Sequence, residues 1–99
     1  MADPTVTALT VSITSKLVST TANEIRDMLL EHINSGITEL TIDMAQVETV
    51  DSSGIGVLIS AQNTIRPKNG IIKVINISTN ILKMFKIMRL DKHFEVSGR

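Results

Sequence analysis

Two consecutive hydroxyl side chains, Ser52 and Ser53, stand between an apolar stretch typical of a strand and an apolar pattern typical of a helix. Segment 51–56 is Asp-Ser-Ser-Gly-Ile-Gly, so the serines fall where the helix is expected to begin. The first N–H groups of a helix have no partner within it, and the helix dipole is positive at that end. A phosphate on Ser52 would be stabilised there. The segment therefore predicts a phosphorylation site, not a catalytic serine.

The same segment has a simpler interpretation as an ordinary helix start, because Asp, Ser and Gly are all common there. Two details favour more than a cap. One hydroxyl would suffice for capping, and Gly54 and Gly56 each cost about 0.5–1 kcal/mol relative to Ala in a helix. Such glycines indicate that something approaches the backbone closely, either a neighbouring element or a partner's surface. Ile55 lies at the edge of the expected buried face. It could therefore pack in the core or contact a partner, and the sequence does not decide between these alternatives.

Known catalytic motifs do not match this chain. Neither serine has a glycine two residues before it, as a nucleophile elbow requires, and the Gly-Lys-Ser/Thr of a phosphate-binding loop is absent. The third glycine of a dinucleotide fingerprint is replaced by Ile59. His32 and His93 have no neighbours at metal-ligand spacing. We expect no catalytic residue, metal or cofactor; the remaining enzyme alternative, a serine nucleophile, lacks a base.

Length and composition restrict the class of protein. Ninety-nine residues predict one domain, 1–99. The absence of cysteine fits a reducing compartment, no apolar run approaches a membrane span of about 20 residues, and the N-terminus lacks the features of a secretion signal. We therefore expect a cytoplasmic protein without membrane insertion. Two aromatic residues and zero net charge argue against nucleic-acid binding.

Charge is distributed unevenly along the chain. Residues 1–59 contain eight acidic and two basic side chains, whereas residues 60–99 contain eight basic and two acidic ones. This asymmetry has two interpretations. The chain could simply have two solvated faces of different charge, or the charges could steer a protein partner electrostatically.

Periodicity predicts alternating strands and helices. Thr21 and Glu24 form a capping-box pattern before the first helix, Gly36 is its expected stop, and Pro67 ends the second helix. The expected order is a short strand near 5–7, a strand at 9–14, a helix at 22–33, a strand at 37–44, a helix from 53, a strand at 71–77, a helix after Ser78 and a last strand at 94–96. This order predicts an α/β domain, a mixed sheet of four to five strands with helices packed on it.

Taken in order, these pieces resemble the STAS domain family, and within it the bacterial anti-sigma factor antagonists. The resemblance covers nearly the whole chain. It rests on the strand 9–14, the helix start 21–26, the segment 40–43, the signature Val-Asp-Ser-Ser-Gly-Ile-Gly-Val-Leu at 50–58, and the segments 81–85 and 90–94. It implies a STAS-type fold, here with a short or absent C-terminal helix.

The resemblance also implies a switch. Ser52 falls on the serine that a GHKL-type kinase, itself the anti-sigma factor, phosphorylates in such antagonists, and a PP2C-like phosphatase reverses the reaction. The unphosphorylated antagonist binds the kinase and the phosphorylated form is released. The expected partner-binding residues are Ser19, Asp51, Ser53, Gly54, Ile55 and Gly56. Ser19 takes a position that is often acidic in the family.

An alternative within the same family is an adaptor that is never phosphorylated, such as the STAS subunit of a lipid-transport ABC complex. The client pathway stays open among a sigma factor, secretion, biofilm formation and a stress response. A second phosphorylation site at Ser53 and the oligomeric state also stay open.

Overall fold

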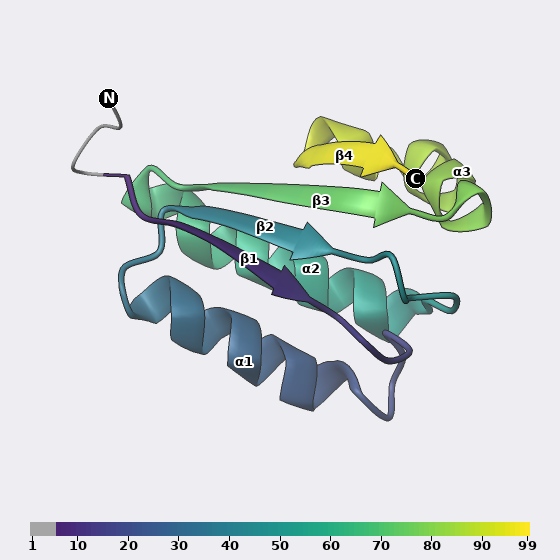
Figure 1. The fold of residues 1–99 in the computed structure, drawn as a ribbon, viewed down its shortest axis with the longest axis horizontal. Helices are drawn as coiled ribbons and strands as arrows, with labels where there is room; N and C mark the ends of the chain where they lie inside the picture. Colours follow the sequence, from purple (N-terminus) through teal and green to yellow (C-terminus); the bar gives the residue numbers. More distant parts are fainter. Residues whose placement is uncertain (1–5) are drawn as a thin grey trace.

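The computed structural model describes residues 6–99 as strands and helices that alternate along the chain (Figure 1). Three α-helices, α1 (Ala22–Asn34), α2 (Ser52–Ile65) and α3 (Thr79–Ile87), lie between four strands, β1 (Ala8–Ser12), β2 (Glu39–Asp43), β3 (Ile71–Ile77) and β4 (Glu95–Gly98). Two short 3-10 helices, η1 (Arg66–Lys68) and η2 (Leu90–Lys92), follow α2 and α3. The expected single α/β domain is confirmed.

The strands form one sheet in the order β1-β2-β3-β4, and each neighbouring pair is parallel. Leu9 lies opposite Leu40, which in turn lies opposite Ile72. Both α1 and α2 cover the same face of the sheet (Figure 1). Because β1 and β2 run in the same direction, the loops that leave them, 13–21 and 44–51, meet at one edge of the sheet, where α2 also begins.

The prediction of a mixed sheet is wrong for the described residues, since all its pairings are parallel. The extra strand near 5–7 accounts for the difference. Thr5 lies outside the described residues, and Val6 and Thr7 form no strand. Instead the Thr7 carbonyl accepts hydrogen bonds from the N–H groups of Thr38 and Glu39, at 2.9 and 3.1 Å. Helical crossovers then join each strand to its neighbour, which makes every pair parallel.

The hydrophobic core fills the space between the helices and the sheet. From α1 it takes Ala22, Ile25, Leu29 and Ile33, from α2 Ile55, Val57, Leu58, Ala61 and Ile65, and from the central strands Leu40, Ile42, Ile72 and Val74. The α3 helix contributes Phe85, whose ring meets that of Phe94 edge to face at 6.1 Å between centroids. This contact joins α3 to the segment that enters β4.

The start of α1 differs from the expected capping box. Thr21 is the residue before the helix, but its side chain makes no capping bond. Its hydroxyl donates to the Lys16 carbonyl at 2.6 Å and accepts from the Val18 N–H at 3.1 Å. Thr21 therefore closes the loop 16–21, and the reciprocal bond with Glu24 is not formed. At the other end, Gly36 has a φ of +114° and follows the helix as expected of a stop residue.

The described chain ends after β4, without a long C-terminal helix, as expected. None of the helices in residues 6–99 combines the length and the apolar composition needed to cross a bilayer.

Candidate phosphorylation and partner-binding site

Asp51 connects the start of α2 to the loop that follows β1. It has extended backbone angles, and its Oδ1 accepts a hydrogen bond from the Gly54 N–H at 3.1 Å, which makes it the N-cap of the helix. Its Oδ2 accepts from the Ser19 N–H, also at 3.1 Å. The Gly54 N–H, helped by that of Ser19, holds the pKa of the Asp51 carboxyl below its ordinary value of 3.8. Asp51 is therefore ionised at neutral pH.

Backbone bonds fasten the same two loops together. The Leu17 N–H donates to the Thr49 carbonyl at 3.0 Å, and the Asp51 N–H donates to the Leu17 carbonyl at 3.3 Å. These bonds create a parallel bridge between Leu17 and Val50, and the Leu17 side chain is fully buried. The surface around the start of α2 is thus held by backbone pairing, a carboxylate tether and a core contact.

Ser52 and Ser53 are the first two residues of α2, and both are exposed. Within residues 6–99 neither hydroxyl makes a hydrogen bond to another protein group. Since Asp51 already caps the helix, the fold does not use the Ser52 hydroxyl as a cap. The hydroxyl is accessible to a modifying enzyme and lies at the positive end of a helix of 14 residues.

The two glycines of the segment have different surroundings. A Cβ on Gly54 would lie 2.8 Å from Leu17 Cγ and 2.9 Å from the Leu17 carbonyl carbon, and closer still to its oxygen. Gly54 is therefore required by a neighbouring element. Gly56 is exposed, and a Cβ there would meet no atom within 4 Å. Packing within the described residues therefore does not explain the glycine at this position.

The structure decides between the two interpretations of Ile55. Its side chain is 3% exposed and belongs to the core. Gly54 is also buried. The exposed members of the predicted partner-binding set are Ser19, Ser53 and Gly56, with Asp51 half-buried between them.

A groove of about 350 Å³ lies beside these residues, between the first halves of α1 and α2. Its lining combines small and polar side chains with one cation, and consists of Ser19, Ala22, Asn23, Arg26, Ser53, Gly56, Val57 and Ser60. Arg26 and Ser60 are not among the candidate residues predicted from the sequence. Helical spacing could have predicted that Ser60 lies beside the site. Ser53, Gly56 and Ser60 are at i, i+3 and i+7 and so share one side of α2.

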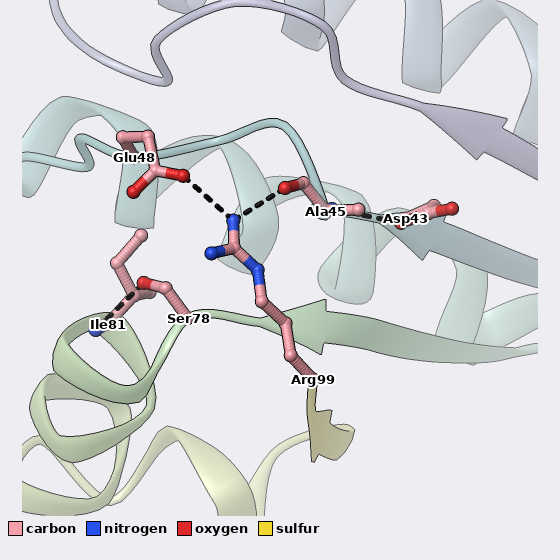
Figure 2. A network of polar contacts seen from close by, with 6 residues as sticks. All are labelled: Asp43, Ala45, Glu48, Ser78, Ile81 and Arg99. Atoms are coloured by element: carbon pink, nitrogen blue, oxygen red, sulfur yellow. Dashed lines mark hydrogen bonds and ion pairs between the residues drawn. The ribbon is translucent and has the colours of Figure 1, made fainter.

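A polar network supports the loop 44–51 that leads to Asp51 (Figure 2). Asp43 Oδ1 accepts from the Ala45 N–H at 2.9 Å and from the Asn76 side-chain amide at 3.1 Å, and both bonds hold the pKa of Asp43 below 3.8. The Arg99 guanidinium donates to the Ala45 carbonyl and pairs with Glu48 Oε1 at 3.0 Å. The ends of β2, β3 and β4 thus jointly fix the approach to the site.

Comparison with known protein families gives one match that spans almost the entire chain, the STAS domain, over residues 2–98. The chain belongs to the STAS domain family. Several proteins of solved structure share its fold. A candidate anti-sigma factor antagonist from Thermotoga maritima superposes with a TM-score of 0.87 at 15% identity, covering 93% of this chain and 80% of that one.

Two further solved structures show the breadth of this fold. The phosphorylated form of the Bacillus cell fate determinant SpoIIAA has a TM-score of 0.71 at 18% identity, covering 90% of this chain and 81% of that one. A sulfate transporter family protein from Wolinella succinogenes has a TM-score of 0.78 at 14% identity, covering 91% and 75%. At these identities the likeness concerns the fold alone, and proteins with different descriptions share this fold.

Proposed function

We propose that this STAS domain is a partner-switching regulator, an anti-sigma factor antagonist without catalytic activity of its own. In the unphosphorylated state it binds a GHKL-type serine kinase that is also the anti-sigma factor. Phosphorylation of Ser52 by that kinase releases it, and a PP2C-like phosphatase restores binding. One observation carries the proposal: Asp51 provides the helix cap, so the exposed Ser52 hydroxyl has no structural task in the described fold.

Electrostatics explains why a phosphate would break the complex. It adds about −1.5 to −2 charges next to the ionised Asp51, and the partner would have to bury these charges at the interface. The fold itself would tolerate the phosphate, because the N-terminus of α2 favours an anion and the two neighbouring loops are held by the Leu17 and Asp51 bonds. The switch would act through surface charge, with little refolding.

The anti-sigma factor antagonist SpoIIAA supports a switch of this type. It has been solved in an unphosphorylated and in a phosphorylated form, and this chain superposes on them with TM-scores of 0.72 and 0.71. The fold therefore matches both states of that protein to the same degree.

The partner surface in this proposal centres on Gly56, with Ser19, Asp51 and Ser53 around it. An exposed glycine within a helix costs stability, and nothing inside the described protein occupies the open space above it. A partner's backbone or side chain that packs against Gly56 would also lie next to Ser52, so charge on Ser52 would directly affect binding.

The proposal is tested by comparing partners bound to wild-type, Ser52→Ala and Ser52→Asp proteins in native lysate, with identification by mass spectrometry. We expect a GHKL-type kinase to be retained by wild type and Ser52→Ala and lost with Ser52→Asp. The matched controls are Ser97→Ala and Ser97→Asp, which make the same changes at an exposed serine of β4, outside the proposed partner surface. Equal retention by Ser52→Ala and Ser52→Asp would refute the switch.

The similarity to a sulfate transporter family protein favours a second candidate function, that of a STAS adaptor within a larger transport complex. Such an adaptor, like the subunit of a lipid-transport ABC system, would bind its ATPase regardless of the state of Ser52. Capture of an ABC ATPase by all of the Ser52 variants would select this candidate.

A further inference from the structure

The outer side of α3 and the turn after it form a positively charged surface with an apolar centre. Ile87 is 81% exposed and Met88 is 48% exposed, and basic side chains surround them. We define the basic patch as Lys83, Lys86, Ile87, Met88, Arg89 and Lys92. In the part of the chain that the structure describes, none of its four cations forms an ion pair. Neither the core nor the proposed Ser52 site uses this surface.

The outer side of α1 has the opposite charge. Glu24, Asp27 and Glu31 occur at i, i+3 and i+7, so they form one exposed line along the helix, which we define as the acidic stripe. Among residues 6–99, Glu24 and Glu31 have no ion-pair partner, and Asp27 meets only the exposed Arg26 at 3.6 Å. Half-buried Met28 and Leu30 border the stripe on either side.

The two surfaces fit each other in length and chemistry. The acidic stripe runs over eight residues, 24–31, which is about 10 Å of helix, and the basic patch covers a comparable length from Lys83 to the turn after α3. They cannot meet within one molecule, because α1 lies under β1 while α3 lies beside β4, at the opposite edge of the sheet (Figure 1).

We propose that the partner of the basic patch is the acidic stripe of a second copy of this chain. In that contact, Lys83 and Lys86 face acidic side chains of the neighbour's α1, and Ile87 packs against the border of the stripe. The formal net charge of the chain is zero, so no overall repulsion opposes the approach of two copies. Exposed ion pairs are individually weak and screened by salt, so the association is weak and salt-dependent.

Sedimentation equilibrium of the full chain tests this proposal. At protein concentrations of about 1 mM and in about 50 mM salt, we expect an average mass above the 10.8 kDa of the monomer, falling back in about 500 mM salt. The variants Lys83→Glu/Lys86→Glu and Glu24→Lys/Glu31→Lys should each be monomeric. Arg66→Glu/Lys68→Glu is the matched control, with the same change in net charge on exposed residues of η1, and should associate as wild type does.

Mixing the variants distinguishes a defined contact from general attraction. Lys83→Glu/Lys86→Glu mixed with Glu24→Lys/Glu31→Lys should form complexes again, since both exchanged surfaces are complementary. Arg66→Glu/Lys68→Glu mixed with Glu24→Lys/Glu31→Lys brings together the same net charges, but in this mixture the only acidic stripes are those of the first variant. Fewer complementary contacts can form, so its average mass should be lower than that of the first mixture. The neutral change Ile87→Ser should weaken wild-type association several-fold, and circular dichroism verifies that each variant is folded.

A monomeric wild type at about 1 mM in low salt overturns the proposal, as does association of Lys83→Glu/Lys86→Glu at the wild-type level. A monomer that instead sediments with vesicles of anionic phospholipid assigns the basic patch to a lipid surface and also overturns it. The test involves neither a kinase nor a phosphate, so its outcome is independent of the proposed role of Ser52.

Discussion

Alanine substitutions at Gly54 and Gly56 are expected to have opposite effects on stability, although the two residues lie in the same helix. Ala is favoured over Gly in a helix by about 1 kcal/mol. At Gly56 this gain is realised, because a new Cβ meets no atom within 4 Å. At Gly54 the Cβ overlaps the Leu17 carbonyl, and Leu17 cannot easily move because its side chain is fully buried and its backbone is bonded to Thr49 and Asp51.

The size of the Gly54→Ala effect follows from these contacts. Forcing a carbon into a packed site costs about 1–3 kcal/mol, and losing the hydrogen bond to the Leu17 carbonyl costs about 1 kcal/mol. After subtraction of the helix-propensity gain, the free energy of unfolding should fall by about 1–3 kcal/mol. With a urea m-value of about 1 kcal/mol/M, the midpoint moves down by about 1–3 M for Gly54→Ala and up by slightly less than about 1 M for Gly56→Ala.

Urea unfolding followed by far-ultraviolet circular dichroism measures both midpoints; the chain has no Trp or Tyr to serve as a fluorescent probe. The same variants separate stability from binding, since Gly56→Ala should weaken capture of the partner while it stabilises the fold. A Gly54→Ala protein as stable as wild type would refute the inferred close packing on Leu17. A Gly56→Ala protein that binds the partner as well as wild type would remove Gly56 from the interface.

Further predictions concern the groups that hold the loops. The lowered pKa of Asp51 means that its contribution to stability is present above the ordinary carboxyl value of 3.8 and is lost as pH falls through the folded-state pKa. Asp51→Ala should therefore lower the melting temperature at pH 7, and the melting temperature of this variant should fall less than that of wild type as the pH is lowered. An equal fall in both proteins would contradict the stabilising role of the Asp51 carboxylate. Arg99→Ala should speed amide hydrogen exchange in the loop 44–51, with exchange in α1 as the internal control; unaltered exchange in that loop would argue against the support shown in Figure 2.

The order of elements and the start of α2 could be predicted because they depend on local patterns. Alternating apolar residues mark β1, helical spacing marks α1 and α2, and Asp51 stands immediately before a helix, where its side chain can reach the Gly54 N–H. The proposed phosphorylation of Ser52, the residue after the cap, rests on these local signals together with the resemblance to the STAS family.

Such local patterns do not predict contacts between residues that are far apart in the sequence. The Thr21–Glu24 motif predicted a capping box, but the Lys16 carbonyl and the Val18 N–H compete for the Thr21 hydroxyl. The cause of the glycine at 54 lies at Leu17, far earlier in the sequence, so it could not be distinguished from partner contact. The same holds for the groove beside Arg26, which depends on how α1 packs against α2.

In the proposed switch, charge on Ser52 controls partner binding while the fold stays the same. This is tested most directly by the affinity of the captured kinase for the wild-type protein before and after complete phosphorylation of Ser52, with circular dichroism of both forms. We expect the phosphate to lower affinity by about 100-fold or more and to leave the spectrum unchanged. Equal affinity of the two forms would contradict the switch, and so would a loss of affinity that accompanies unfolding.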